Sequence, residues 1–110
     1  MIFNKEGTTT IVSQENASLQ KFLKNLKDAY KTLKNDHIIV NLFSFSLLSS
    51  GDLLEFLELS NTHRGSKKSF VLVTEKVSCD EAPDEICVVP TIQEAKDIIE
   101  MEEIERDLNL

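Results

Sequence analysis

The segment from His37 to Thr74 decides the fold, and it reads HIIVNLFSFSLLSSGDLLEFLELSNTHRGSKKSFVLVT. Its first seven residues, 37–43, are almost continuously apolar, which predicts a strand that is central in a sheet or covered on both faces. A Ser-rich stretch follows, and a helix with a wide apolar side fits residues 52–63. The run 69–74 is rich in β-branched and aromatic residues and predicts another strand. This order predicts two parallel strands joined by a helix.

The flanking segments continue the alternation of strands and helices. Gly7 separates two short segments that predict a hairpin. Asn16 or Ser18 is a candidate N-cap for the helix that follows the hairpin. Thr91 and Glu94 have the spacing of a capping box at the start of the last helix. The expected elements outside the central segment are strands over 2–4 and 8–13, a helix over 17–34, a helical turn within 75–85, a short strand over 86–89 and a final helix from residue 92.

The element order is therefore β-β-α-β-α-β-(α)-β-α. It predicts one α/β domain over residues 1–110, with a mixed sheet of about four to five strands and helices packed on it. We expect two layers, and a loose helical tail over the last eight residues. No linker or internal repeat divides the chain.

Composition indicates an ordinary globular protein. The chain has 110 residues, of which 41% are hydrophobic and 28% charged. Its net charge of −7 argues against a nucleic-acid partner, because phosphate affinity comes mainly from clustered Lys and Arg. No apolar run approaches the roughly 20 residues that cross a bilayer, and the N-terminus has no signal-peptide pattern. We therefore expect a cytoplasmic protein that does not bind membranes.

Charge is distributed unevenly along the chain. Residues 1–74 carry nine basic and seven acidic side chains, whereas residues 75–110 carry three basic and twelve acidic ones. The first helix is rich in lysine and the last helix is rich in glutamate. These are either two solvated faces that keep the protein soluble, or a basic and an acidic surface that meet complementary partners or copies.

The residues of catalytic and metal sites are scarce. Cys79 and Cys87 are the only cysteines, and we expect both to be thiols, with Cys87 as a small core residue. His37 and His63 are far apart in the sequence and match no metal-binding motif. The sequence also lacks the Gly-rich phosphate-binding motifs. We therefore predict no enzymatic activity, no metal and no cofactor.

A polar group stands at the end of the second helix. Asn61, His63 and Arg64 have the chemistry to bind a carboxylate or a phosphate. The simpler interpretation is that His63 and Arg64 complement the negative end of the helix dipole, with Gly65 as the residue that terminates the helix.

The central segment resembles the STAS domain, the fold of bacterial anti-sigma-factor antagonists. That family has a strand ending in an Asp-Leu-Ser-like step, and an Asp-Ser-Ser-Gly-Leu-like turn then opens a helix. Here the strand is 37–42, the loop is 43–51, the helix runs over 52–59 and the next strand is 70–73. The other elements occur in the family's order, so the resemblance implies a single STAS-like domain over 1–110.

The resemblance also implies a modification site. In antagonists, a partner kinase phosphorylates the first serine after the Asp of this turn. Here that role falls on Ser49 or Ser50, depending on the alignment. Three positions differ from the family: Asn41 stands at the strand-end Asp, Leu48 or Ser49 stands at the Asp before the serine pair, and Gly-Leu-Gly becomes 51–53, Gly-Asp-Leu.

Elementary electrostatics allows such a switch. A serine at a helix N-terminus lies where backbone N–H groups and the helix dipole favour an anion. A phosphate there adds about −1.5 to −2 charge and repels a partner docked on that surface. The alternatives are a plain N-cap, which contributes about 1 kcal/mol, and an anion or nucleotide contact.

The leading hypothesis is a non-catalytic, cytoplasmic regulatory module resembling anti-sigma-factor antagonists. Its partner is a protein, either a kinase-type anti-sigma factor or another regulator, and its oligomeric state is left open. The loop and the second helix form the docking surface, with Ser49 and Ser50 as the switch. The residues expected on this surface are Ser46, Ser49, Ser50, Gly51, Asp52 and Glu55.

Two other hypotheses remain. The chain is similar in general look to small bacterial proteins assigned to ribonuclease Z, but it lacks that enzyme's His/Asp motif. It would then be a non-catalytic accessory protein of an RNA-processing nuclease, using the lysines of the first helix. An enzyme of unrecognised type has only the general capacity of small α/β folds in its favour.

Overall fold

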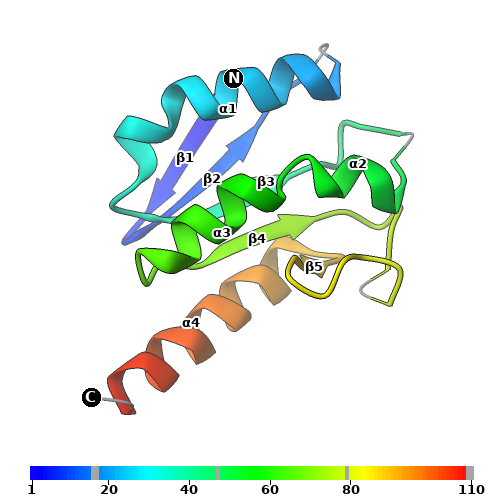
Figure 1. Cartoon of the computed structure of the whole chain (residues 1–110). Coiled ribbons are helices and arrows are strands. Elements are labelled where there is room, and N and C mark those ends of the chain that lie inside the picture. The colour runs from blue at the N-terminus through cyan, green and yellow to red at the C-terminus, as the bar shows by residue number, and fades with distance from the viewer. Residues whose placement is uncertain (16–17, 47, 79, 109–110) are drawn as a thin grey trace.

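The computed structural model describes residues 1–15, 18–46, 48–78 and 80–108. Its centre is a five-stranded mixed sheet in the order β1-β2-β3-β4-β5 (Figure 1). β1 and β2 form an antiparallel hairpin, and the other neighbours pair in parallel. The predicted mixed α/β sheet is confirmed. The strands are β1 (Ile2–Glu6), β2 (Thr9–Ser13), β3 (His37–Asn41), β4 (Phe70–Val73) and β5 (Cys87–Val89).

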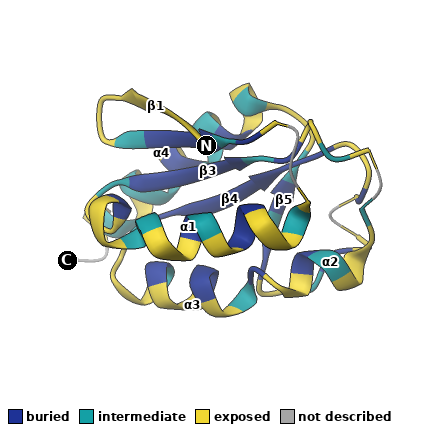
Figure 2. Ribbon diagram, turned by 90° about the horizontal axis from the view of Figure 1, so that it is seen from above, coloured by how far each residue is buried: buried dark blue, intermediate teal, exposed yellow. Residues whose placement is uncertain are grey.

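Helices cover both faces of the sheet. Buried side chains of α1 (Leu19–Leu33), α2 (Ser50–Leu54) and α3 (Leu57–Gly65) pack on one face, and α4 (Ile92–Leu108) packs on the other (Figure 1). Side chains alternate along the inner strands, so each strand contributes to both apolar clusters. The domain has three layers, and the expected two-layer arrangement was wrong because α4 crosses to the second face. Figure 2 shows the sheet buried between the helices and β1 exposed at the edge.

The helix boundaries follow their caps. α1 begins after Ser18, whose Oγ accepts a hydrogen bond from the Lys21 N–H at 3.1 Å. The alternative cap, Asn16, lies outside the described residues. Thr91 Oγ1 accepts from the Glu94 N–H at 3.1 Å at the start of α4. The part of the chain expected to be a loose tail continues α4 as far as Leu108.

The single helix expected over 52–63 is two helices, α2 and α3. Leu53 and Phe56 are both fully buried, whereas Leu54 between them is half exposed. The apolar residues in this segment are too closely spaced for one helix to bury them all on one side. The chain turns after Leu54, which sends Phe56 into the core.

Candidate functional site

The loop between β3 and α2 is anchored to the body of the domain. Asn41 ends β3, and its side-chain oxygen accepts a hydrogen bond from the Phe43 N–H at 3.0 Å. The ring of Phe45 stacks on Phe22 of α1, with 5.6 Å between the ring centres. Leu48 is partly buried against the same core. These contacts tie the described residues of the loop to the end of β3 and to the core.

Ser49 and Asp52 form a reciprocal capping box at the start of α2. The Asp52 N–H donates to Ser49 Oγ at 3.3 Å, and the Ser49 N–H donates to Asp52 Oδ2 at 3.0 Å. Asn41 and Asp52 thus give this loop its local structure, and both stand where the sequence departs from the STAS pattern. The capping role considered for Ser49 is present in the structure.

The predicted docking residues lie at the surface. Ser49 and Ser50 are exposed and Asp52 is half-buried. A hollow of about 280 Å³ separates the start of α1 from α2 and includes Asp52 and Glu55 in its lining. The remaining predicted docking residues, Ser46, Gly51 and Glu55, are all exposed.

Two large apolar side chains are exposed on the same loop and helix, at positions that the sequence pattern did not single out. Phe43 is 48% exposed on the loop, and Leu54 is 50% exposed at the end of α2. The close spacing of apolar residues around Leu54 was the available signal, because a single helix face cannot bury them all. Exposed apolar area marks an interaction surface where it is contiguous, and these two side chains are the large exposed apolar residues of the loop and of α2.

The electrostatics around the two serines is negative. Asp52 Oδ2 lies within hydrogen-bonding distance of the Ser49 backbone, and exposed Glu55 follows one turn later. A phosphate on either serine would add charge to this acidic group. Within the described residues, no cluster of His, Cys, Asp or Glu could hold a metal ion.

The two histidines lie near one another at the other end of β3, which their sequence spacing did not indicate. His63 is fully buried, and its Nε2 lies 2.7 Å from the carbonyl oxygen of Asp36, the residue before His37. Because a carbonyl only accepts, Nε2 of His63 carries the proton. Nδ1 of His63 then accepts from the hydroxyl of Tyr30 at 2.8 Å.

His37 is held in the same neutral form. The Ser69 N–H donates to its Nδ1 at 2.9 Å, so the ring proton is on Nε2 and is donated to Glu103 Oε1 at 2.6 Å. Burial lowers the pKa of both His37 and His63, and in His37 burial together with Lys68 and Arg106 outweighs the opposing effect of Glu103. Both imidazoles are therefore structural and neutral at pH 7.

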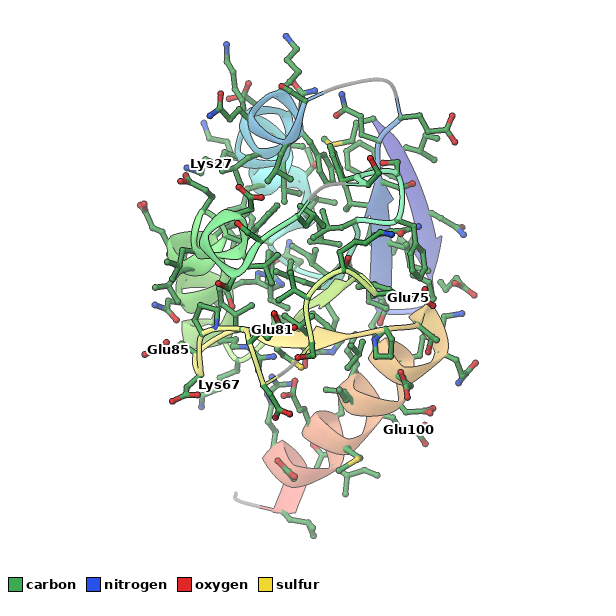
Figure 3. All side chains as sticks on the ribbon, turned by 90° about the vertical axis from the view of Figure 1, so that its right-hand side faces the viewer. Lys27, Lys67, Glu75, Glu81, Glu85 and Glu100 are labelled. Carbon is green, nitrogen blue, oxygen red and sulfur yellow. The ribbon has the colours of Figure 1, made fainter. Side chains whose placement is uncertain are left out.

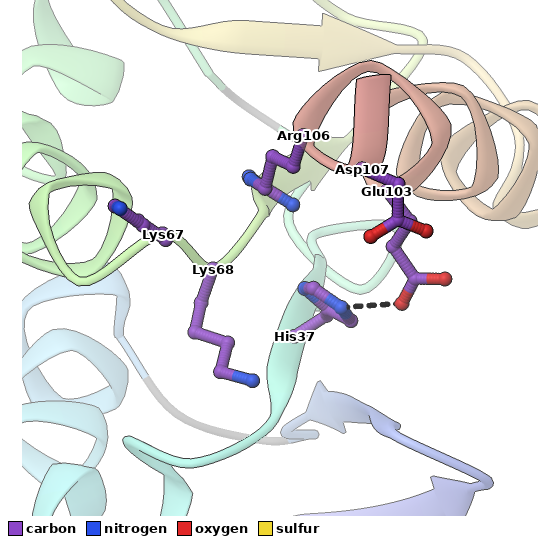
Figure 4. Close-up of a pocket in the computed structure, with 6 residues that line it drawn as sticks. All are labelled: His37, Lys67, Lys68, Glu103, Arg106 and Asp107. Atoms are coloured by element: carbon purple, nitrogen blue, oxygen red, sulfur yellow. Dashed lines mark hydrogen bonds and ion pairs between the residues drawn. The ribbon is translucent and has the colours of Figure 1, made fainter. Parts of the chain in front are cut away.

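Charged residues from α4 and from the loop between α3 and β4 surround His37. A pocket of about 290 Å³ here is lined by His37, Lys67, Lys68, Glu103, Arg106 and Asp107 (Figure 4). Beside it, the Glu102 carboxylate accepts hydrogen bonds from Arg64 and Ser69. These contacts fasten α4 to the start of β4.

The group predicted at the end of the second helix is not one site. Asn61 is exposed, whereas His63 is buried and Arg64 turns toward Glu102. The expected terminating role of Gly65 was wrong, because Gly65 is still helical and Lys67 adopts the positive φ of 64°. Cys87 is half-buried against the α4 side of the sheet, and Cys79 lies outside the described residues.

Comparison with solved structures identifies the fold. No family model and no curated protein sequence matches the chain. A structure of a serine-to-glutamate variant of Moorella thermoacetica RsbS superposes with a TM-score of 0.64 at 13% identity, covering 96% of this chain and 97% of that chain. The chain has a divergent STAS fold.

A second solved structure agrees with this assignment. It comes from a study of the molecular architecture of the stressosome, a signal integration and transduction hub. Its chain superposes with a TM-score of 0.58 at 13% identity, and the match covers 90% of this chain and 96% of the other. Over its described residues, this chain has no helix long and apolar enough to span a membrane.

Proposed function

We propose that this STAS chain is a non-catalytic, cytoplasmic regulatory module that binds a protein partner through the β3–α2 loop and α2. The observation that carries the proposal is the exposed serine pair at the start of α2, with Phe43 and Leu54 exposed on the same loop and helix. The fold is shared with RsbS and with a component of the stressosome structure, which supports a regulatory role of the anti-sigma-factor-antagonist kind. The proposed partner is a kinase-type anti-sigma factor or another regulatory protein.

Phosphorylation of Ser49 or Ser50 would release this partner. The Ser49 Oγ already accepts a backbone hydrogen bond, whereas Ser50 is the first residue of α2 and presents its side chain to solvent. A phosphate on either residue joins Asp52 and Glu55 in one negative group. A partner whose docking face is apolar or acidic would then be repelled.

Site-specific crosslinking tests the docking surface. A photoreactive amino acid is placed at Leu54, or at Met101, which is exposed on α4 on the other side of the sheet. In native lysate, we expect the Leu54 probe, and not the Met101 probe, to capture an ATP-binding kinase-type regulator identified by mass spectrometry. Equal capture of that regulator at both positions, or capture of nuclease components at Leu54, would reject the docking surface, whereas capture of a second copy of this chain at Met101 would not.

Charge substitution tests the switch with the captured partner. We expect Ser49→Asp or Ser50→Asp to weaken the dissociation constant by about tenfold, which corresponds to about 1.4 kcal/mol. Gln93→Glu is the matched control, because it adds the same charge to an exposed first turn, that of α4. An equal loss of binding for all three variants would show general charge repulsion instead of a local switch.

A nuclease accessory role is the second candidate. Its supporting observation is that α1 and its C-cap expose the lysines Lys21, Lys24, Lys27, Lys31 and Lys34. We expect any such role to appear as RNA binding that weakens with salt and disappears in the Lys24→Glu/Lys27→Glu/Lys31→Glu variant. Absence of RNA binding at low salt removes this candidate.

A further inference from the structure

The outward side of α4 carries an apolar stripe with no partner in the described part of the chain. Met101, Ile104 and Leu108 are spaced as neighbours on one side of a helix and are 59%, 53% and 79% exposed. The opposite side of α4 is the buried one, where Ala95 and Ile99 pack on the sheet. The stripe therefore plays no part in holding α4 to its own domain.

Acidic side chains flank this stripe and extend it. Glu105 lies on one side, Glu100 and Asp107 lie on the other, where Asp107 also lines the pocket beside His37, and Asp97 lies in line with Met101 one turn earlier. Asp97, Glu100, Glu105 and Asp107 are all exposed, and none of them has an ion pair within the described residues. Other acidic side chains of α4 turn inward, as Glu102 does toward Arg64. We call the apolar stripe with its four acidic neighbours the α4 outward face.

A basic surface of similar length lies on the far side of the sheet. Lys24, Lys27, Lys31 and Lys34 are spaced as one stripe along α1, are exposed, and lack ion pairs in the described part of the molecule. We call this stripe the α1 lysine face. Figure 3 shows Lys27 and Glu100 on opposite sides of the molecule.

The α1 lysine face also offers room for an apolar side chain. A hollow of about 290 Å³ opens on it, and its lining residues are Gln20, Leu23, Lys24, Lys27 and Asp28. Lysine stems cover apolar surface while the ammonium group stays in water. Along the helix axis, residues 24–34 span about 15 Å and residues 97–108 span about 17 Å, so the two faces match in length.

We propose that the α4 outward face of one copy docks on the α1 lysine face of a second copy. The apolar stripe then covers the hollow, and the acidic borders meet the lysines. A symmetric pairing of two α4 helices would place the acidic borders against one another. Because the two faces are different and lie on opposite sides of the domain, the contact is head-to-tail and builds a ring or an open chain.

Reciprocal charge reversal tests this contact in the full chain. One variant reverses the basic side, Lys24→Glu/Lys27→Glu, and the other reverses the acidic side, Glu100→Lys/Glu105→Lys. We expect sedimentation velocity to show concentration-dependent association of the native chain that weakens with salt. Each reversed variant alone should associate at least about tenfold more weakly, and an equimolar mixture of the two should recover association.

Further variants separate a specific contact from a general effect of charge. Lys67→Glu/Lys76→Glu changes net charge as much as the α1 reversal but alters other exposed lysines, and it should leave association unchanged. Ile104→Gln alters an exposed residue, so it should lose association and keep the native circular dichroism spectrum.

Three results would overturn the proposal. The first is that the native chain stays monomeric at every concentration, even at low salt. Association that survives the α1 reversal but fails in Ile104→Gln would identify a symmetric α4 pairing. RNA binding by the α1 lysine face without any self-association would assign that face to nucleic acid. None of these results bears on crosslinking at Leu54, so this inference and the proposed function fail separately.

Discussion

Tyr30 and His63 illustrate how one buried polar pair constrains the core. The Tyr30 hydroxyl donates to Nδ1 of His63, and burial raises the pKa of Tyr30, which keeps the donor protonated. Tyr30→Phe leaves Nδ1 of a fully buried ring without a donor. We expect the free energy of unfolding to fall by about 1 kcal/mol or more, measured by urea denaturation at pH 7.5.

Thr32→Val is the control, since Thr32 is exposed on the same helix and bonds only to a local carbonyl. Its effect should stay within about 0.5 kcal/mol. An equal effect of the two substitutions would mean that the Tyr30 bond contributes no net stability.

The two adjacent serines of the site differ in their structural roles. Ser49 caps α2 through its Oγ, while Ser50 is exposed at the first position of that helix. We expect Ser49→Ala to lower the free energy of unfolding by about 1 kcal/mol. Ser50→Ala should change it by less than about 0.5 kcal/mol. Chemical denaturation of the two variants side by side checks this, and indistinguishable midpoints would contradict the capping role.

At the scale of elements, Glu102 is one of several polar residues that attach the second half of α4, beside the Glu103–His37 and Arg106–Ser69 hydrogen bonds. Glu102 accepts from Arg64 at 3.0 Å and from the Ser69 hydroxyl, so it connects α4 to both α3 and the start of β4. We expect Glu102→Ala to speed hydrogen exchange of the amides over 100–108 while those over 92–99, near buried Ala95 and Ile99, change little.

Glu100→Ala supplies the comparison, because Glu100 is exposed on the same helix. It should leave the exchange of both parts of α4 unchanged. Faster exchange along the whole helix in Glu102→Ala would mean that α4 detaches as one unit and that the apolar contacts do not hold its first half.

The elements themselves were largely predictable, and the reason is local. The apolar runs that became β3 and β4, the spacing of apolar residues in α1 and the Ser18 and Thr91 caps are all properties of neighbouring residues. The break between α2 and α3 was missed because it depends on where Phe56 finds space in the core. That information lies in the packing of the whole domain.

The candidate site was also predictable only in part. The capping of α2 by Ser49 followed from residue type and position, whereas the exposure of Phe43 and Leu54 depends on how the loop and α2 sit on the core. The meeting of His37 and His63 was likewise hidden, since they come from a strand and a helix 26 positions apart in the sequence. Sequence spacing predicts which residues are neighbours within one helix or strand, but it does not predict which residues of different elements come into contact.

For the whole molecule, the neutral histidines set a pH dependence of stability. Burial lowers the pKa of His37 and His63 below the ordinary value of 6.5 in the folded state. The unfolded chain therefore binds protons more readily below that value, so acid favours unfolding. This contribution to stability is fully present above pH 6.5 and is lost as the pH falls through the folded-state pKa values.

Protonation of His37 at Nδ1 would also place two donors face to face, because the Ser69 N–H already points at that atom. Other charges near His37 act in both directions: Lys68 and Arg106 lower its pKa, and Glu103 raises it. We expect the free energy of unfolding to decrease between pH 7 and pH 5, with each histidine contributing at most about 1.4 kcal/mol per pH unit.

Thermal and urea unfolding across this range measure the effect, and His37→Gln and His63→Gln variants separate it from the carboxylates. Each variant should be less stable than the native chain at pH 7, because its hydrogen bonds are imperfectly replaced. Each should also show a flatter loss of stability toward pH 5, since the remaining acid dependence then comes from one histidine and the carboxylates. A pH slope that is the same in the native chain and in both variants would mean that neither imidazole changes its proton affinity on folding.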